Sequence, residues 1–365
     1  MKKIRLGLSA TLTGSLSLQG IDSFNGLTLW AEFQNSLGGI YVKEIGSGLP
    51  VDLIYLDDKS DPALTKEITA HLINHEEVDL LLGPYSSSLS LACAEVAENS
   101  GRVVWNYGGS TDEILGDKYK NTVTLITPAS RYLDPYLEFI KDRHDRGPAI
   151  AIVYAEDSGF SRQVSGGAIR FCIENNIAHK IYTYRSGTDN FLDIIGKIRV
   201  DSINTVIGVG RYEDDLRFAP HLEGFNACLP AAAIDQFHTE LGIRSNGFCS
   251  ISQWEPEMNF IPDFGIDSAV FTELYSNRFG KIPDYVSAQS FNIGVVLSHF
   301  IEKLGTINEI RLKEEILNSR FKTFYGDFSG GNSYGGHKTV ATQWQDGKKQ
   351  IIYPSSHATS DYKLP

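Results

Sequence analysis

Short apolar runs alternate along the chain with segments of helical periodicity. Residues 4–10 have the pattern of a buried strand, and the apolar positions in residues 24–37 recur every three or four residues, as in a helix. Strands follow at 51–56, 78–82 and 103–105, and helices follow the Asp61-Pro62 cap and at 89–97. Alternating units of this size predict a parallel sheet with helices on both faces.

The pattern restarts in the second half. Strands are expected at 148–154, 180–184, 204–209 and 228–233, with helices at 161–174 and 191–200. A helical region at 271–319, a glycine-rich stretch at 326–336 and two short strands at 339–344 and 350–353 complete the chain. The predicted fold class is therefore α/β, with two doubly wound parallel-sheet lobes. The cleft between such lobes is the expected ligand site.

Composition narrows the possible partners. The chain has 365 residues, 42% hydrophobic and 21% charged, which suits two globular domains rather than a disordered chain. Its formal net charge is -12, and no dense basic block offers a surface for nucleic acid or an anionic membrane. No run reaches the roughly 18 apolar residues that cross a bilayer.

The N-terminus leaves the compartment open. Met1, Lys2 and Lys3 give the basic start of a signal peptide, but Arg5 interrupts the apolar run, which is better interpreted as the first core strand. We therefore expect a periplasmic or extracellular protein if a leader precedes this sequence. If Met1 is native, we expect a cytoplasmic one.

The sequence lacks the common signatures of catalysis and cofactor binding. There is no phosphate loop, no GxGxxG after the first strand and no GxSxG elbow, and Gly208-Val209-Gly210 lacks the third glycine of a dinucleotide motif. His71 and His75 share a predicted helix face without the glutamate of a zinc motif. The widely spaced cysteines favour free, buried thiols over disulfides or zinc: Cys93, Cys172, Cys228 and Cys249. We expect no enzyme, no metal and no cofactor.

Two loops carry the candidate chemistry. Residues 83–88 (Gly-Pro-Tyr-Ser-Ser-Ser) lie between a strand and a helix, where hydroxyls meet the free N–H groups of a helix start. Residues 106–111 (Asn-Tyr-Gly-Gly-Ser-Thr) repeat this arrangement after the next strand. The pair suits a carboxylate or another small oxyanion. The alternative is that one serine is a helix N-cap and the others fill the turn.

A series of short motifs runs in order along the whole chain. They are Leu12-Thr13-Gly14, Asn25-Gly26, Leu37-Gly38-Gly39-Ile40, Asp57-Asp58 with Asp61-Pro62, the loops 83–88 and 108–110, Gln343-Trp344-Gln345-Asp346-Gly347-Lys348, and Tyr353-Pro354. With these motifs the chain resembles type I periplasmic solute-binding proteins of the branched-chain amino acid-binding family. The resemblance implies three crossovers, near Thr127, near Trp254 and within 325–336. Lobe one would then be 1–127 plus 255–326, and lobe two 128–254 plus 327–365.

The resemblance also implies ligand positions in lobe one. Ser87, Gly108 and Ser110 fall where the family holds a ligand carboxylate. Gln19 stands where many relatives have an aromatic residue over the ligand side chain, which is a departure. Tyr85 and Tyr107 flank these positions and are expected to help shape the pocket.

In lobe two, Phe160 falls at a further contact position, and either Arg211 or Tyr212 falls at another. Asp235 matches the acidic residue that pairs with a substrate ammonium, and an acidic group in a closed cleft would favour an amine ligand. The alternative is that Asp235 only caps the next helix. Trp254 either stacks on the ligand or packs at a crossover.

The expected function is that of a receptor for an ABC transporter. It would bind an amino acid or a similar small polar or aromatic solute by lobe closure and present it to a membrane permease. The alternative is a cytoplasmic or signalling sensor of amides or amino acids on the same fold. Ser60 and Ser86, which stand where periplasmic relatives have a disulfide, favour a reducing compartment.

Overall fold

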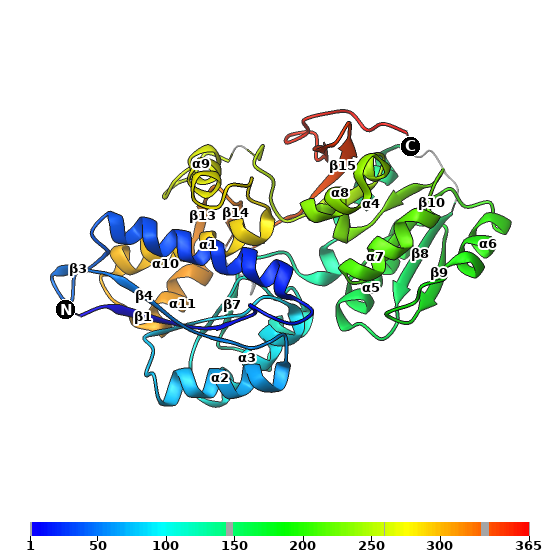
Figure 1. The fold of residues 1–365 in the computed structure, drawn as a ribbon. Coiled ribbons are helices and arrows are strands. Elements are labelled where there is room, and N and C mark those ends of the chain that lie inside the picture. The colour runs from blue at the N-terminus through cyan, green and yellow to red at the C-terminus, as the bar shows by residue number, and fades with distance from the viewer. Residues whose placement is uncertain (1, 144–148, 259, 330–335, 365) are drawn as a thin grey trace. The chain divides into compact units, whose positions relative to one another are not determined.

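The computed structural model describes residues 2–143, 149–258, 260–329 and 336–364. Internal contacts divide the chain into two compact units: unit 1 is Met1–Thr127 with Met258–Lys338, and unit 2 is Pro128–Glu257 with Thr339–Pro365. The chain therefore passes between the units three times (Figure 1).

The passages lie at 127–128, 257–258 and 338–339, compared with 127–128, 254–255 and 326–327 in the sequence interpretation. Residues 330–335, part of the last expected passage, lie outside the described residues. Two hydrogen-bond contacts account for the later boundary: the hydroxyl of Thr127 lies 2.9 Å from Nδ1 of His337 and donates to its carbonyl oxygen at 2.9 Å. These bonds tie residue 337 to unit 1.

The described part of unit 1 contains these elements: β1 (Ile4–Ala10), α1 (Ser17–Ser36), β2 (Ile40–Val42), β3 (Ser47–Leu49), β4 (Val51–Asp57), α2 (Pro62–Asn74), β5 (Leu80–Leu82), α3 (Ser87–Asn99), β6 (Val104–Asn106), the 3-10 helix η1 (Asp112–Leu115), β7 (Thr122–Thr124), α9 (Ser268–Phe279), α10 (Tyr285–Leu304), α11 (Glu309–Asn318), β13 (Arg320–Lys322) and β14 (Asp327–Ser329). Its main sheet has the order β4-β1-β5-β6-β7, and all pairs are parallel.

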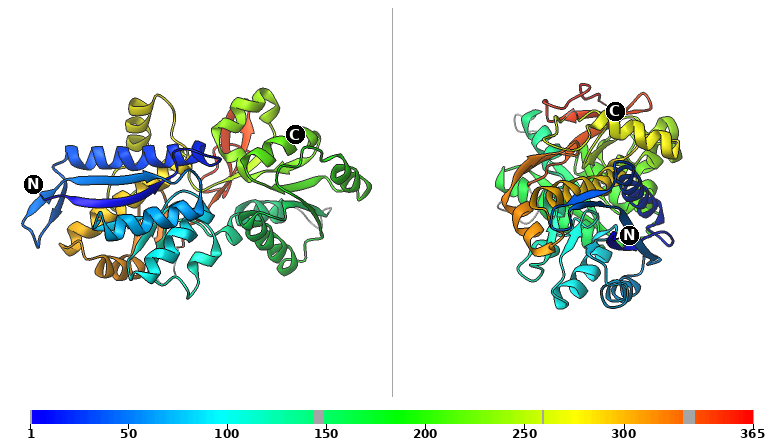
Figure 2. Two further views of the ribbon diagram at one scale, coloured as in Figure 1. Left: turned by 60° about the horizontal axis from the view of Figure 1, so that its bottom comes forward. Right: turned by 90° about the vertical axis from the view of Figure 1, so that its left-hand side faces the viewer.

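Helices cover both faces of this sheet. Figure 1 and the left view of Figure 2 place α1 and α2 on opposite faces. On one face, α2 and α3 bury Leu72 and Cys93 against β5 and β6. On the other, α1 packs closely on α10, because a Cβ on Gly26 would lie 2.2 Å from the carbonyl oxygen of Ser287. The Trp30 indole also donates to Ser298 across this contact at 3.2 Å.

The described part of unit 2 contains these elements: the 3-10 helix η2 (Ala129–Arg131), α4 (Asp134–Arg143), β8 (Ile150–Ala155), α5 (Gly159–Glu174), β9 (His179–Tyr184), α6 (Leu192–Val200), β10 (Thr205–Val209), α7 (Tyr212–Phe218), η3 (Ala219–His221), β11 (Asn226–Cys228), η4 (Pro230–Ala233), α8 (Asp235–Leu241), η5 (Gly242–Ser245), β12 (Cys249–Ser252), β15 (Val340–Gln345) and β16 (Lys348–Tyr353). The sheet order is β16-β15-β12-β11-β10-β8-β9.

Strand alternation builds two cores in unit 2. In β8, Ala151 and Val153 enter the core beneath α6, α7 and α8, whereas Ile150 and Ile152 enter the core beneath α4 and α5. The fold class is thus confirmed as α/β and doubly wound. The sheet of unit 2 is not wholly parallel, because β15 and β16 are antiparallel to their neighbours.

The helical region predicted at 271–319 consists of three helices, because Gly280 and Gly305 end α9 and α10 in the left-handed conformation, with φ of 72° and 70°. One strand prediction was wrong. The strand expected at 228–233 ends at Cys228 and continues as η4, since Pro230 has no N–H to donate to a strand partner. The cap of α2 is confirmed: Asp61 accepts from the backbone of Ala63 at 2.7 Å.

All four cysteines are buried and free, as expected, and burial raises the pKa of each thiol. His71 and His75 stack on each other with ring centroids 5.1 Å apart. No group of metal-ligating side chains occurs among the described residues. Within the same residues, no helix is both long and apolar enough to cross a membrane.

Candidate functional site

The candidate site in unit 1 lies at the carboxyl edge of its sheet. The order β4-β1-β5-β6-β7 puts β1 beside β5, and the chain leaves β1 toward β4 on one side and reaches β5 on the other. Ligands of doubly wound sheets bind at such a switch point, outside the carboxyl ends of the strands. The segments that follow β1, β5 and β6 lead to Gln19, Ser87 and Ser110, respectively.

The loops after β5 and β6 are packed backbone to backbone. Ser86 N–H donates to the carbonyl oxygen of Gly108 at 3.2 Å. A Cβ on Gly108 would lie 2.4 Å from the carbonyl oxygen of Pro84 and 2.7 Å from Cα of Tyr85. Asn106 holds the second loop by accepting from Gly109 N–H at 2.9 Å and donating to its carbonyl oxygen at 2.7 Å. Glycine is therefore required where the loops meet.

Two serine hydroxyls at these loops are available to a ligand. Ser87 is the first residue of α3, Ser110 precedes η1, and both are half-buried. Neither side chain has a hydrogen-bond partner within the described part of the chain. Ser86, the N-cap of α3, has a φ of 92°, a strained conformation for a residue other than glycine. Free hydroxyls beside a helix N-terminus can hold a small anion.

The other residues expected in unit 1 differ in exposure. Gln19 is 7% exposed on α1, and its amide makes no hydrogen bond with other described residues. Tyr85 is half-buried. Tyr107 is only 2% exposed, and burial raises its pKa, although a hydrogen bond with Ser23 opposes this. Tyr107 is thus buried within unit 1, with its hydroxyl bonded to Ser23 of α1.

A pair of carboxylates braces the loop after β1. Asp57 accepts from the backbone of Leu12 and from the hydroxyl of Thr13, at 3.0 and 2.7 Å. Burial acts to raise the pKa of Asp57, but its hydrogen bonds outweigh burial and lower it. Asp58 is fully buried, accepts from Thr11 at 3.0 Å, and has a pKa raised by burial. The sequence analysis used Asp57-Asp58 only as part of a series of motifs. Two adjacent acidic residues at the end of a predicted strand could have indicated that they hold the neighbouring loop.

In unit 2, the aromatic residues expected at the site lie at or near the carboxyl ends of the strands. Phe160, on the first turn of α5, is half-buried and packs edge-on against Tyr132 with centroids 5.9 Å apart. Tyr212 begins α7, and its buried hydroxyl has no hydrogen-bond partner among the described residues. Trp254 is fully buried, which agrees with the packing alternative. Ser252 holds its backbone by donating to the carbonyl oxygen of Trp254 at 2.7 Å.

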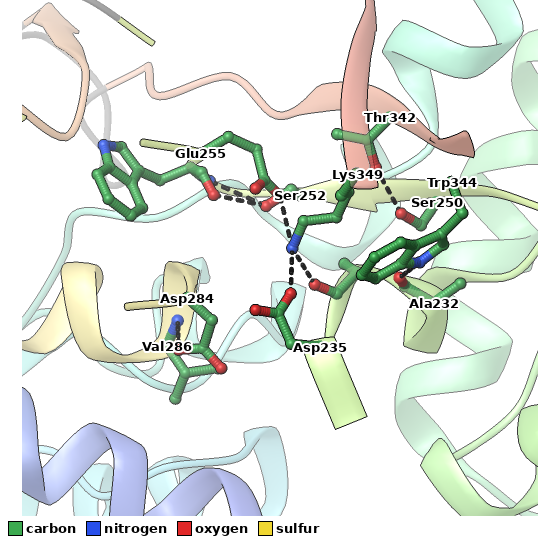
Figure 3. A network of polar contacts seen from close by, with 12 residues as sticks. Ala232, Asp235, Ser250, Ser252, Glu255, Asp284, Val286, Thr342, Trp344 and Lys349 are labelled. Atoms are coloured by element: carbon green, nitrogen blue, oxygen red, sulfur yellow. Dashed lines mark hydrogen bonds and ion pairs between the residues drawn. The ribbon is translucent and has the colours of Figure 1, made fainter. Parts of the chain in front are cut away.

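Asp235 already has a cationic partner. Its Oδ1 accepts from Nζ of Lys349 at 3.1 Å, and Oε1 of Glu255 lies 3.0 Å from the same nitrogen (Figure 3). Asp235 begins α8, but its side chain makes no capping hydrogen bond. The sequence analysis offered two roles for Asp235, pairing with a ligand ammonium or capping a helix. It did not predict this ion pair within the chain.

A separate hollow in unit 1 lies away from these loops. It has a volume of about 460 Å³ and includes Asp79 and Arg102, at the amino ends of β5 and β6. Its cations are paired: Arg102 with Glu309 at 2.8 Å and Arg311 with Glu44 at 3.3 Å. The hollow is therefore at the opposite edge of the sheet from the candidate site.

Comparison with known families decides the class of protein. The model of a family described as "Periplasmic binding protein" matches residues 3–349. The chain belongs to this family. Membership makes it a solute-binding protein and implies a location outside the cytoplasm.

Relatives of this periplasmic binding protein are distant but cover its full length. The Leu/Ile/Val-binding protein homolog 7 of Brucella melitensis is 21% identical, over 99% of this chain and 94% of the relative. The leucine binding protein LivK of Thermotoga maritima has a TM-score of 0.82 at 18% identity, covering 95% of this chain and 97% of its own. A solute-binding protein of R. palustris, solved with benzoate, has a TM-score of 0.78 at 16% identity and covers 99% of both chains. The structures support the fold.

Proposed function

We propose that the chain is the solute receptor of an ABC transporter and binds a small carboxylate, an amino acid or a related polar or aromatic solute. The observation that carries the proposal is the pair of unpartnered hydroxyls, Ser87 and Ser110, on two loops packed together at the switch point of unit 1. Ser87 and Ser110 would donate to the carboxylate, and the N-terminus of α3 would favour its charge.

The names of relatives support this class of ligand. The relative in Brucella is named for leucine, isoleucine and valine binding, and a neighbour from Streptococcus pneumoniae, with a TM-score of 0.81, was solved with isoleucine. The R. palustris neighbour was solved with benzoate. All three ligand types are small carboxylates with an apolar body. None of these names favours the alternative of a cytoplasmic or signalling sensor.

The remaining parts of the proposal concern transport. Phe160 and Tyr212 stay predictions for contacts with the apolar body of a ligand. The liganded protein would then be recognised by a membrane permease in the periplasm or outside the cell. Binding would involve no bond making or breaking, as in other binding proteins.

Isothermal titration with a panel of small carboxylates tests the proposal. For any carboxylate that binds, Ser87→Ala and Ser110→Ala are each expected to weaken affinity about tenfold, or ~1.4 kcal/mol, through loss of a charge-assisted hydrogen bond. Ser88→Ala is the matched control, because Ser88 is exposed and its hydroxyl lies 3.4 Å from that of Ser86. If both test variants bind as tightly as the unsubstituted chain, the site is wrongly assigned.

A further inference from the structure

Gln19 is a buried amide that has no partner within the described part of the chain. It lies on the first turn of α1, is only 7% exposed, and makes no hydrogen bond with other described residues. Buried amides are ordinarily bonded, because burial removes water from a polar group and a new hydrogen bond offsets that loss. The Gln19 amide therefore has hydrogen-bonding capacity that the described residues do not use.

Two other amides of the same helix show the ordinary arrangement. Gln34 is half-buried and donates to the carbonyl oxygen of Gly39 at 2.9 Å. Asn35 is exposed, yet it accepts from the backbone N–H of Val51 at 2.7 Å and donates to its carbonyl oxygen at 2.9 Å. Gln19 is more buried than either of these amides but has neither kind of bond.

The first turn of α1 is fixed against the loop after β1. The Ser60 hydroxyl accepts from the backbone N–H just before α1 at 3.0 Å and donates to the carbonyl oxygen of Thr13 at 2.8 Å. A Cβ on Gly20 would lie 1.9 Å from the carbonyl oxygen of Thr11, so only glycine allows the helix to come this close. The backbone at Gln19 is therefore positioned before any ligand binds, which lowers the cost of ordering its side chain.

The helix face that carries Gln19 meets the end of β6, beside the serine loops. Ser23 lies four residues after Gln19, so the two side chains share a face of α1. Ser23 is bonded to the Tyr107 hydroxyl, and Tyr107 directly precedes Gly108, where the loops after β5 and β6 meet. Because α1 begins at the carboxyl edge of the sheet, Gln19 lies one turn nearer to that edge than Ser23. Gln19 thus belongs to the same edge of unit 1 as the two unpartnered serines.

An amide recognises different chemistry from the serine pair. The hydroxyls and the N-terminus of α3 suit a carboxylate, whereas the Gln19 amide offers a carbonyl acceptor as well as N–H donors. A hydroxyl or an amide on the ligand can bond to both kinds of group. An apolar substituent would leave the buried Gln19 amide unpaired, which is how a hydrogen-bonding site rejects an analogue that lacks the matching group.

We propose that Gln19 binds a hydroxyl or amide substituent on the small carboxylate that Ser87 and Ser110 hold. The ligand would then differ from leucine or benzoate, whose bodies carry no such substituent. This inference rests on the proposed function, since it assumes that the two serines hold a carboxylate. It uses residues of unit 1 alone.

Isothermal titration with matched pairs of carboxylates tests the inference. The pairs are asparagine with leucine, threonine with valine, and 3- and 4-hydroxybenzoate with the corresponding methylbenzoates. The members of a pair have similar shapes but differ in one polar group. In at least one pair, the polar member is expected to bind at least tenfold more tightly than its apolar partner. Gln19→Leu is expected to bring the two affinities of that pair within twofold of each other.

Two further variants serve as controls. Gln34→Leu removes an amide of the same helix that is already bonded within the chain, so the ratio of the two affinities should not change. Ser110→Ala should weaken both members of the pair alike, because both carry the carboxylate. A thermal melt of each variant checks that it is folded.

The outcomes distinguish the two proposals. If the apolar member of every pair binds as tightly as its polar partner or more tightly, the inference is overturned while the proposed function stands. The same holds if Gln19→Leu leaves the ratio unchanged or weakens both members equally, since Gln19 would then not bind the substituent. If no probe binds, carboxylate binding itself is contradicted, and the inference falls with it.

Discussion

The two carboxyl edges differ in the partners of the side chains that were expected to bind the charged groups of a ligand. In unit 1, Ser87 and Ser110 have no hydrogen-bond partner among the described residues. In unit 2, Asp235 is paired with Lys349, and Asp215 accepts from two backbone amides. Both edges belong to doubly wound sheets, so topology brings polar residues to each. Only their partners decide which of them remain available to a ligand.

This difference leads us to expect different contributions from the two units. The unit 1 edge offers donors next to a helix N-terminus, which suits the anionic end of a ligand. The unit 2 edge carries the half-buried Phe160 and Tyr212, and its Asp235 is paired with Lys349. We therefore expect substitutions in the ion pair of Asp235 and Lys349 to affect stability, and substitutions in the unit 1 loops to affect binding.

The largest effect should come from removing the buried cation of unit 2. Lys349→Met removes the cation that pairs with Glu255, whose side chain is 5% exposed. Breaking a buried ion pair from one side costs about 3–5 kcal/mol, so the free energy of unfolding should fall by this amount in denaturant titrations at pH 8. The loss should shrink at pH 5, because protonated Glu255 needs no counter-charge.

Two further variants test whether the loss in Lys349→Met comes from the unbalanced charge of Glu255. Lys363→Met is the matched control, since Lys363 and its partner Asp346 are 57% and 84% exposed, and it should change stability by less than about 0.5 kcal/mol. Adding Glu255→Gln to Lys349→Met should recover part of the loss. A loss below about 1 kcal/mol in Lys349→Met would mean that the cluster contributes little to unit 2.

The second effect concerns the contact between the unit 1 loops. In Gly108→Ala, the new Cβ would lie 2.4 Å from the carbonyl oxygen of Pro84, so one backbone must move. We expect a loss of about 1–3 kcal/mol in unfolding free energy and at least tenfold weaker carboxylate binding by titration. Gly116→Ala is the control: it has a φ of -78° and its Cβ would lie 3.5 Å from the nearest atom, so both quantities should be nearly unchanged. Retention of full affinity in Gly108→Ala would show that the packed loops do not form the site.

The sequence predicted those features of the fold and site that depend on local pattern. Alternating apolar segments predicted the doubly wound fold, and Asp61-Pro62 predicted the start of α2 because a cap depends only on adjacent residues. The loops after β5 and β6 were found from their glycines and serines. Whether these loops hold a ligand remains a prediction.

Features that depend on distant partners could not be predicted in this way. Lys349 lies 114 residues from Asp235, and no local pattern links them. Tyr107 follows a strand of only three residues, too short for its alternation to indicate that the ring points inward. The later passage between the units depends on the bonds between Thr127 and His337, which join residues 210 positions apart.

Counted per pH unit, the smallest effect is a pH dependence carried by the second buried carboxylate of unit 2. Burial raises the pKa of Asp215 to about 8, although Ala231 and Gly210 N–H groups oppose this. Between pH 4 and 8 the folded chain keeps a proton that the unfolded chain has lost, so stability should fall as pH rises, by about 1 kcal/mol per pH unit. Glu255 adds to the fall up to about pH 7.

Asp215→Asn should flatten the slope of stability against pH in denaturant titrations, whatever its absolute stability. Asp201→Asn is the control, because hydrogen bonds from Lys180 and Tyr182 lower the pKa of Asp201 and its titration lies below this range. An equal slope with and without Asp215 would show that this carboxylate is ionised when folded, and unit 2 would then hold more negative charge than its ion pairs balance.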